Sequence, residues 1–516
     1  MAKAAKQETK KIENILWDAC NKLRGSVTPA EYKNVVLALI FLKFVSDKFE
    51  KRRQELIDSG KERFVDIDAF YQQDNIFFLA PESRWEYLKT NAKQPDIALK
   101  IDDALAKIEK ANSVLRGALP DGIFAKLGIE NSTLSSLVDT ISKIDTLQDE
   151  ANDIIGRVYE YFLMKFALSE GKGKGEFYTP KTVVSLICEM IQPYKGKIYD
   201  PCAGSGGMFV QSMKFVQAHQ GNLKDVSIYG QEKIKETYKL AKMNLAIRGL
   251  AADMGETAAS TFTNDQHKDL KVDYVITNPP FNLKDWREND ELVDDPRWSG
   301  YELPPLGNAN YAWILHIVSK LSQNGVAGFL LANGALDGSG VEKAIRQKLI
   351  ETEDLVEAIC ILPQNMFYTT NISVTLWILN RNKREHDTEL MHYRNREHEV
   401  LFMDLRQFGE PFEKKYIQFS NEQIQQITTT FHNWQSDKSK YQDVPEFCKS
   451  VTLDEIREKD FSLVPSRYIE FINRDENVDF AEKMSKLRIE LSDLLKAEVE
   501  LKSELEKVFK DLGYDL

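Results

Sequence analysis

Strand-like and helix-like segments alternate from residue 180 to residue 379, and this alternation restricts the fold more than any other feature. Apolar runs predict strands at 197–199, 226–230, 272–277, 326–331, 355–362 and 373–379, with a weak strand near 251–255. Amphipathic periodicity predicts helices at 180–193, 208–219, 233–248, 309–323 and 340–352. Such alternation is typical of a mostly parallel sheet covered by helices on both faces. The last two strands are close in sequence, so we expect an antiparallel edge.

The residues before this region show helical periodicity and no strong strand. The stretch "KIENILWDACNKLRG" places apolar side chains on one helical face, and Thr28 and Pro29 predict the N-cap and first turn of a second helix. Further helices are expected at 97–111, 132–143 and 150–167. We therefore expect a helical domain at 1–168, followed by the α/β domain at 169–400.

The sequence after residue 400 is polar and less regular, and we treat 401–479 as an extension. A heptad pattern then predicts a helix over 480–516, with one polar interruption at Glu498. Its apolar positions are Met484, Leu487, Leu491, Leu494, Leu501, Leu505 and Val508. This helix either packs on its own domain or pairs with a coiled coil of another chain.

The composition limits the partners that the chain can have. A net charge of −12 argues against DNA binding by this chain alone, but not against DNA that a basic partner presents. The five cysteines are too scattered for a zinc site and are typical of a reduced, cytoplasmic protein. The longest apolar run, 35–44, is too short to span a bilayer. We expect a cytoplasmic protein without a metal or a membrane segment.

Two elements of the α/β region are suited to a nucleotide-like ligand. In "KIYDPCAGSGGMF" (197–209) a strand ends at Asp200 and leads into a glycine loop with Gly204, Gly206 and Gly207. Glycines there permit positive φ and close approach of a ligand, although the spacing fits neither a P-loop nor GxGxxG. Glu232 follows the next strand, where a carboxylate can accept both hydroxyls of a ribose. Each element alone is a weak signal.

A third element is "VDYVITNPPF" (272–281), in which a buried strand leads directly into Asn278, Pro279, Pro280 and Phe281. The prolines fix the backbone and lack N–H groups. The Asn278 side-chain oxygen and the Pro279 carbonyl could then accept both N–H bonds of an exocyclic amine on a base. Phe281 could stack on the ring of a base flipped out of a helix.

A fourth element is "GEFYTPKTVVSLICEMI" (175–191), where we expect Thr179 to be the N-cap and Pro180 the first helical residue. This helix start could cover the amino-acid end of a cofactor.

Together these elements resemble S-adenosylmethionine-dependent DNA adenine-N6 methyltransferases of the γ order, and the whole chain is similar to the modification (M) subunits of type I restriction–modification systems. The supporting segments are 16–50, "FYTP", "DPCAGSGGMF", "NPPFN", "LPQNMFYTTNISVTLWILNR" (362–381) and "DFSLVPSRYI" (460–469). The resemblance implies a Rossmann-like class I methyltransferase fold with a seven-stranded, mostly parallel sheet. The domain at 169–400 would be catalytic, and the helix at 480–516 would serve subunit association.

The resemblance also implies roles for individual residues. The cofactor, S-adenosyl-L-methionine, would be held by Glu176, Phe177, Tyr178, Thr179, Pro180, Lys181, Asp200, Gly204, Ser205, Gly206, Gly207, Glu232 and Glu256, and the catalytic residues would be Asn278, Pro279, Pro280 and Phe281. Asp200 would bind or orient the methionyl amine. Glu256 would meet the adenine end, a role that Asp253 or Asp265 could also fill. No metal is needed for this reaction.

The partners that the resemblance implies are a specificity (S) subunit, with two M subunits for each S subunit, and double-stranded DNA with a flipped adenine. A restriction (R) subunit could join them. The alternatives are a protein-glutamine or RNA amino-methyltransferase, a cytosine-N4 acceptor, or a scaffold subunit that has lost activity.

Two further features are weighed on the residues alone. Cys202 lies in the glycine loop rather than at the catalytic strand end, which argues against a nucleophilic thiol.

The loop at 282–308 is either a disordered surface loop or a mobile element that orders over DNA. The second alternative is favoured because Trp286, Trp298 and Tyr301 are costly to expose.

Overall fold

The computed structural model describes residues 29–74, 76–144, 160–165, 178–367, 371–389, 391–412, 416–472 and 480–511. These residues form two units. The larger unit ends at Ile469 and excludes Val444–Glu446, whereas the smaller unit contains Val444–Glu446 and the residues from Glu470 onward. The two units are described separately below.

The N-terminal part of the larger unit is helical. Its helices are α2 (Pro29–Asp58), α3 (Ala69–Gln72), α4 (Trp85–Thr90), α5 (Ile97–Ala111), α6 (Ile123–Lys126) and α7 (Asn131–Ile141). The helices expected at 97–111 and 132–143 therefore agree with α5 and α7 to within two residues. The expected helix before Thr28 and most of the one at 150–167 lie outside the described residues.

The apolar run at 35–44 forms the centre of this helical part. In α2 this run is buried on all sides, as expected of a helix that other helices surround. The same hydrophobic core includes Leu240, Met243 and Ile247 of a helix that belongs to the α/β part. The helical part thus shares a core with the α/β part.

A mixed sheet forms the centre of the α/β part. Its strands are β1 (Gly196–Asp200), β2 (Val226–Gly230), β3 (Ala252–Asp253), β4 (Val272–Thr277), β5 (Leu321–Ala332), β6 (Val356–Ile361), β7 (Val374–Asn380), β10 (Glu399–Asp404) and β13 (Cys448–Thr452). The order across the sheet is β13-β10-β6-β7-β5-β4-β1-β2-β3. Neighbouring strands are parallel from β3 to β5, and β6 and β10 are also parallel.

The mixed α/β class with a mostly parallel sheet is confirmed, but the sheet is larger than expected. It has nine strands instead of seven, because β10 and β13 come from the residues around and after position 400. The chain reverses after β6, so β7 runs antiparallel between β5 and β6 and lies inside the sheet instead of at its edge. The antiparallel edge is β13, which pairs with β10.

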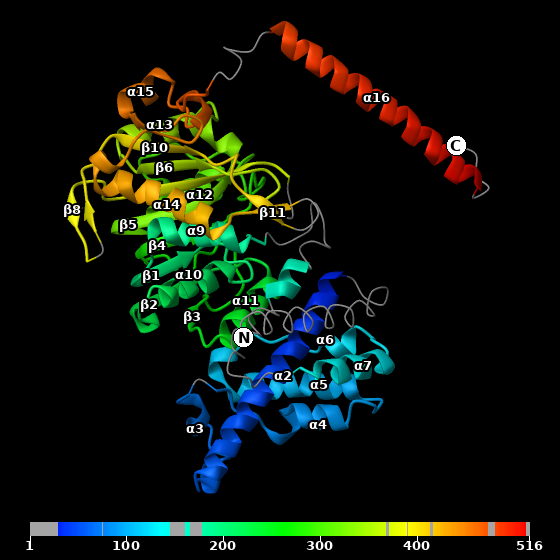
Figure 1. Cartoon of the computed structure of the whole chain (residues 1–516). Helices are drawn as coiled ribbons and strands as arrows, with labels where there is room; N and C mark the ends of the chain where they lie inside the picture. The colour runs from blue at the N-terminus through cyan, green and yellow to red at the C-terminus, as the bar shows by residue number, and fades with distance from the viewer. Residues whose placement is uncertain are drawn as a thin grey trace. The chain divides into compact units, whose positions relative to one another are not determined.

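Helices cover both faces of the sheet (Figure 1). They are α9 (Lys181–Ile191), α10 (Gly207–Ala218), α11 (Lys235–Ile247), α12 (Asn310–Lys320), α13 (Val341–Glu351), α14 (Asn421–Ser436) and α15 (Leu453–Glu458). One core contains apolar side chains of α9, α10 and α14, and a separate core contains those of α12 and α13. Two small hairpins complete the unit, β8 (His386–Asp387) with β9 (His392–Tyr393) and β11 (Glu410–Phe412) with β12 (Tyr416–Gln418).

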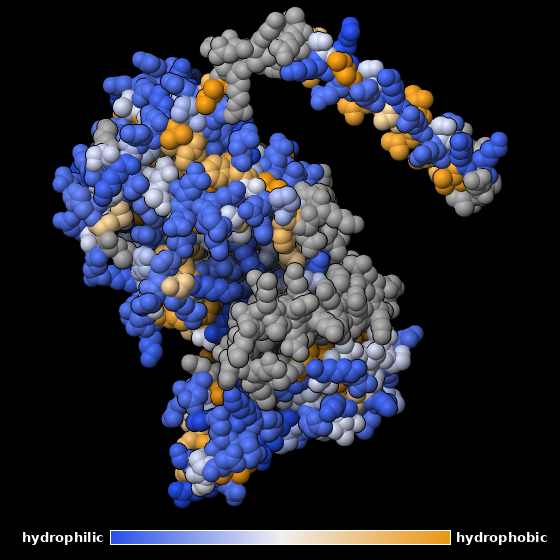
Figure 2. All heavy atoms as spheres, in the orientation of Figure 1, coloured by the Kyte–Doolittle hydropathy of each residue, from blue (hydrophilic) through white to orange (hydrophobic). Residues whose placement is uncertain are grey.

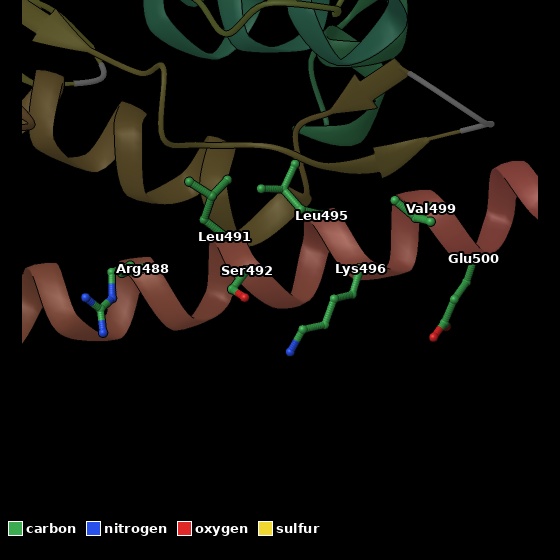
Figure 3. A pocket seen from close by; sticks show the side chains of 7 residues that line it. All are labelled: Arg488, Leu491, Ser492, Leu495, Lys496, Val499 and Glu500. Atoms are coloured by element: carbon green, nitrogen blue, oxygen red, sulfur yellow. The ribbon is translucent and has the colours of Figure 1, made fainter.

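The smaller unit is dominated by one long helix, α16 (Phe480–Asp511). Apolar side chains along it are largely exposed: Leu491 is 58%, Leu494 68% and Leu501 64% exposed. They form orange patches between blue, hydrophilic residues in Figure 2. Figure 3 shows Leu491, Leu495 and Val499 on one side of the helix and Ser492 and Lys496 on the other. Within the described residues, no helix is long and apolar enough to cross a membrane.

Candidate functional site

The site lies where β1, β2 and β4 end side by side. Because β1 pairs in parallel with both β2 and β4, the residues that follow these three strands share one edge of the sheet. Thr277, the last residue of β4, donates a hydrogen bond from Oγ1 to Asp200 Oδ1 at 2.6 Å. The backbone N–H of Cys202 donates to the same oxygen at 3.1 Å. The glycine loop and the Asn-Pro-Pro-Phe segment are therefore joined through Asp200.

The pKa of the Asp200 carboxyl is unusually high for an aspartate. Burial raises the pKa of its carboxyl to about 7, against the lowering effect of the hydrogen bonds from Thr277 and Cys202. The Glu232 carboxylate raises this pKa further. A cation bound beside Asp200 would favour its ionised form. The site is thus suited to a ligand that carries a positive charge.

Glu232 connects the glycine loop to the start of α11. Its Oε2 accepts a hydrogen bond from the Gly204 N–H at 3.0 Å, and its Oε1 accepts one from the Ile234 N–H at 2.8 Å. Gly204 has φ +55°, and Gly206 has φ +76° as the N-cap of α10, a conformation that residues with a Cβ rarely adopt. Since each carboxylate oxygen can accept more than one hydrogen bond, Glu232 can still accept from ribose hydroxyls.

The rest of the glycine loop is fixed by backbone contacts. The Ser205 carbonyl accepts a hydrogen bond from Asn244 Nδ2 of α11 at 2.7 Å, and the Gly206 N–H donates to the Ala203 carbonyl at 2.8 Å. Gly207 is the first residue of α10. The loop therefore presents the N-terminal end of α10, whose free N–H groups favour electronegative ligand atoms.

Among the described residues, one polar atom of the Asn278 side chain finds no hydrogen-bond partner. Its side chain is buried, and its Nδ2 donates a hydrogen bond to Thr179 Oγ1 at 2.9 Å. Its Oδ1 is also buried but has no hydrogen-bond partner among the described residues. Pro279 is buried, whereas Pro280 and Phe281 are half-buried. Leaving a buried acceptor unpaired costs free energy, so this oxygen marks a place for an external donor.

The start of α9 differs from the expectation by one residue. The N-cap is Pro180, with ψ 137°, and α9 begins at Lys181, so Thr179 as N-cap and Pro180 as first helical residue were wrong. Thr179 instead uses its hydroxyl to accept the hydrogen bond from Asn278. Tyr178 is half-buried beside it. Glu176 and Phe177 lie outside the described residues.

Glu160 is a buried carboxylate that the sequence interpretation missed. It forms ion pairs with Lys181 of α9, with Lys214 of α10 at 3.1 Å and with Arg248, just after α11, at 3.0 Å. Burial would raise the pKa of Glu160, but the three cations lower it to about 2. Of these cations, Lys181 belongs to the 176–181 segment expected to hold the cofactor. The signal in the sequence, one acidic residue among the aromatic residues of 159–162, is weak.

Glu256 lies at a cleft between the helical and α/β parts of the larger unit. The cleft has a volume of about 790 Å³, and its lining includes Arg116, Lys233 and Tyr238. The two alternatives to Glu256 are engaged differently. Asp265 is buried and forms an ion pair with Lys320 at 2.6 Å, and Asp253 accepts a hydrogen bond from the Gly255 N–H. Of the three carboxylates, only Glu256 lines this cleft.

The loop at 282–308 is packed against the α/β part, so the first of the two alternatives, a disordered surface loop, does not apply. Trp286 and Trp298 are buried in the same core as the apolar residues of α12, and their indole N–H groups donate to the carbonyls of Pro305 and Leu292. Asn282 donates from its backbone to Asn310 Oδ1 and accepts from Asn310 Nδ2. These bonds fix the residue that follows Phe281.

Cys202 does not have the properties of a nucleophile. Its Sγ lies 3.1 Å from Thr277 Oγ1, and burial, followed by the Asp200 charge, raises the pKa of its thiol well above the usual value. A protonated thiol is a poor nucleophile. Within the part of the chain that the structure describes, no cluster of three potential metal ligands occurs.

Comparison with known families gives two matches that together cover most of the chain. The N-6 DNA methylase family matches residues 150–477, and the HsdM N-terminal domain family matches residues 12–144.

Individual relatives agree with these family matches. The HindI type I restriction enzyme methylase subunit of Haemophilus influenzae is 42% identical over 455 residues, which cover 84% of this chain and 99% of that protein. The MjaIX methylase subunit of Methanocaldococcus jannaschii is 33% identical, over 98% of this chain and 92% of that one. The crystal structure of a type I restriction-modification methyltransferase subunit from Streptococcus thermophilus has the same fold, with a TM-score of 0.73, 24% identity, and coverage of 90% of this chain and 100% of that chain.

Proposed function

Because this chain belongs to the N-6 DNA methylase family, among the methylase subunits of type I restriction enzymes, we propose that the edge formed by β1, β2 and β4 is its active site. The reaction is the transfer of a methyl group to N6 of adenine in DNA. Family membership favours this reaction over methylation of protein glutamine or RNA and over a scaffold that has lost activity. The unpaired Asn278 Oδ1 is the observation that carries the proposal.

The residues at this edge fit S-adenosyl-L-methionine, which supplies the methyl group on a sulfonium cation. Asp200, with its raised pKa, would face the positively charged methionyl part. Glu232 would accept the ribose hydroxyls, and Gly204, Ser205, Gly206 and Gly207 would border the cofactor with backbone atoms. The cleft at Glu256 would receive the adenine end. The segment 176–181, whose last four residues are described, would cover the methionyl end.

Asn278 and the two prolines would hold the target amine. Asn278 Oδ1 and the Pro279 carbonyl would each accept one N–H bond of adenine N6, which draws the nitrogen toward tetrahedral geometry and frees its lone pair. Pro280 stiffens the segment, and the half-buried Phe281 would stack on the flipped base. The chain contributes positioning and exclusion of water, and no covalent enzyme intermediate is required.

The partners follow from the relatives, which are named as subunits of restriction enzymes. We propose that a specificity subunit chooses the DNA site, with two copies of this chain for each specificity subunit, and that a restriction subunit can join. The exposed apolar side chains of α16 would pair with helices of the specificity subunit. An acidic chain needs such a partner to hold DNA, and these assemblies would work in the cytoplasm.

The test is Asn278→Ala in the complex with the specificity subunit. Loss of one preorganised transition-state contact lowers the rate about 100-fold or more, so methylation should fall by that factor. The affinity for S-adenosylmethionine, measured by calorimetry, should stay within about twofold. A variant that methylates DNA at the parental rate would refute the assignment of Asn278. A parent that neither binds the cofactor nor methylates DNA, alone or in its complex, would support the scaffold alternative.

A further inference from the structure

The glycine loop after β1 contains residues with unusual conformational freedom. Glycines permit the positive φ angles at positions 204 and 206, but glycine also loses more freedom on folding than any other residue. A loop that moves before the cofactor arrives has to be ordered when the cofactor binds, and this ordering weakens the affinity. Residues that hold the loop in place therefore affect binding even if they do not touch the cofactor.

Asn244 of α11 holds the loop in this way. Its side chain is buried, and its Nδ2 donates a hydrogen bond to the Ser205 carbonyl at 2.7 Å. At the other end of the same peptide group, the Gly206 N–H donates to the Ala203 carbonyl at 2.8 Å. The peptide group between Ser205 and Gly206 is thus held at both ends, directly before the first residue of α10.

Arg248 in turn holds the Asn244 side chain. Its Nη1 donates to Asn244 Oδ1 and, at 2.9 Å, to the Asn244 backbone carbonyl, and its Nη2 donates to Glu160 Oε1 at 3.0 Å. An arginine only donates hydrogen bonds, and a carbonyl oxygen only accepts them. Both partners of the Asn244 amide therefore require the same orientation, with Oδ1 toward Arg248 and Nδ2 toward Ser205. A continuous row of hydrogen bonds joins Glu160 to Ser205.

The helix that carries Asn244 is itself packed on two sides. One side belongs to the core of the helical part, through Leu240, Met243 and Ile247. Another side lies against the glycine loop, since a Cβ on Gly206 would be 3.5 Å from Leu245 Cγ. Helical periodicity places Asn244 between these two sides. The amide is thus presented to the loop from a rigid element, as accurate positioning requires.

We propose that Asn244 and Arg248 are positioning residues for the cofactor, which hold the glycine loop in its binding conformation and join it to Glu160. This inference rests on the function proposed above. The two residues act through the backbone of Ser205 and Gly206 and need no contact with the cofactor. Because the loop borders the cofactor both before and during methyl transfer, a loop that is held less well should weaken binding without slowing the bound complex.

The first test is Asn244→Asp in the full chain, measured in its complex with the specificity subunit. The new side chain keeps the size and still accepts from Arg248, whose positive charge favours the ionised carboxylate. The oxygen that replaces Nδ2 faces the Ser205 carbonyl, so a hydrogen bond is lost and two acceptors repel each other. The Kd for S-adenosylmethionine, measured by calorimetry, should rise about 10- to 30-fold. At saturating cofactor, kcat should stay within about twofold.

Arg248→Lys tests the second link. A lysine keeps the positive charge beside Glu160 but has one nitrogen where the arginine uses two, so it cannot keep the contacts with Glu160 and Asn244 in the same geometry. The Kd should rise by about threefold or more, again without a change in kcat. This variant carries the test if Asn244→Asp fails to fold.

Asn112→Asp is the matched control. Asn112 is buried in the helical part, and its Nδ2 also donates to backbone carbonyls, those of Phe78 and Ile108. The same change of atoms should destabilise the chain, which urea unfolding measures, and should leave the Kd for S-adenosylmethionine at the parental value.

Two results would overturn the proposal. A parental Kd in both Asn244→Asp and Arg248→Lys would show that the loop is held without this row of hydrogen bonds. A rise in Kd that Asn112→Asp shows to the same extent would indicate a general loss of stability instead. Failure of the proposed function is seen separately, because the parent complex would then neither bind S-adenosylmethionine nor methylate adenine, whatever the variants do.

Discussion

The edge of the sheet around Asn278 and the helix α16 depart from the usual pattern of burial in opposite ways. At the sheet edge, polar side chains from distant parts of the sequence are buried and bonded to one another, as Asp200 is to Thr277 and Asn278 to Thr179. Along α16, apolar side chains such as Leu491 and Leu494 are more than half exposed. The side chains of the first region are held in place by other residues of the same chain. The second has the apolar surface of an interface, and we propose that another chain completes it.

The two parts of the molecule also differ in how far their ion pairs are buried. Glu160 is buried among cations from three elements, whereas the ion pair between Lys502 and Glu498 on α16 lies in solvent. Exposed pairs of this kind contribute about 0.3–0.5 kcal/mol in helices, so they barely constrain α16. The buried cluster instead joins the helices that follow the cofactor segments. The following predictions test this contrast.

The largest effect is expected for Glu160→Gln. Removing a buried carboxylate leaves Lys181, Lys214 and Arg248 without their counter-charge and should cost about 3 kcal/mol, at the low end for buried pairs because both lysines remain partly exposed. Urea unfolding measures this change, and Glu490→Gln on α16 is the control that should stay within about 0.5 kcal/mol.

The pH dependence of this effect has a definite sign. The pKa of Glu160 is lowered from 4.5 to about 2 in the folded chain. Its stabilising contribution is therefore present above pH 4.5 and is lost as the pH falls toward 2. Equal stability of the parent and Glu160→Gln at neutral pH would contradict the buried cluster.

The next effect is expected for Leu491→Asp in α16. Loss of one buried leucine at an interface should weaken association with the specificity subunit by about 1.5–3 kcal/mol. Ser492→Asp adds the same charge on the other side of the helix and serves as the control (Figure 3). Calorimetric titration measures both variants. Equal weakening by both would show that the apolar side of α16 is not the interface.

A smaller effect is expected for the pH dependence of cofactor binding. Asp200 has a pKa of about 7 in the free chain, and a cationic ligand would lower it, so binding releases a proton below pH 7. The affinity for S-adenosylmethionine should therefore rise with pH, by up to about tenfold per unit below pH 7. Calorimetry from pH 5.5 to 8 measures this slope. The Asp200→Asn variant should bind S-adenosylmethionine more weakly, and its affinity should not depend on pH in this range. An affinity of the parent that does not change with pH would show that the positive charge of the ligand does not lie beside Asp200.

The smallest effect is expected for Cys202→Ser. The Cys202 thiol contacts the Thr277 hydroxyl, and a serine can keep a polar contact there. The methylation rate should stay within about threefold, a change below 1 kcal/mol. A nucleophilic thiol would instead make this the most damaging substitution at the sheet edge.

Much of the α/β part could be predicted from local pattern. The strands at 226–230 and 272–277 match β2 and β4, because buried apolar runs between turn residues have few other solutions. The internal position of β7 could not be predicted, since it depends on which strand the chain pairs with after it reverses. That β10 and β13 join the sheet could not be predicted either, since this also depends on which strands pair with one another. Most residues of these strands lie in 401–479, which the sequence analysis treats as an irregular extension.

The candidate site was also only partly predictable from the sequence. The sequence predicted that Asp200, Glu232 and Asn278 lie at one edge of the sheet, since each stands at or just after the end of a predicted strand and the carboxyl ends of parallel strands meet there. It did not reveal Glu160 or the partner of Asn278. It also gave Thr179 the role of a cap, because a threonine before a proline is a common helix start.

The sequence by itself determined the α/β class, the strand ends that carry the candidate site and the apolar positions of α16, because these depend on periodicity and on residue types that lie close together along the chain. Only the tertiary structure decided which polar atoms meet. Hydrogen bonds act over about 3 Å, so the bond from Asn278 to Thr179 exists only once two segments 99 residues apart are packed together. That packing also decides which oxygen of the site is left without a partner.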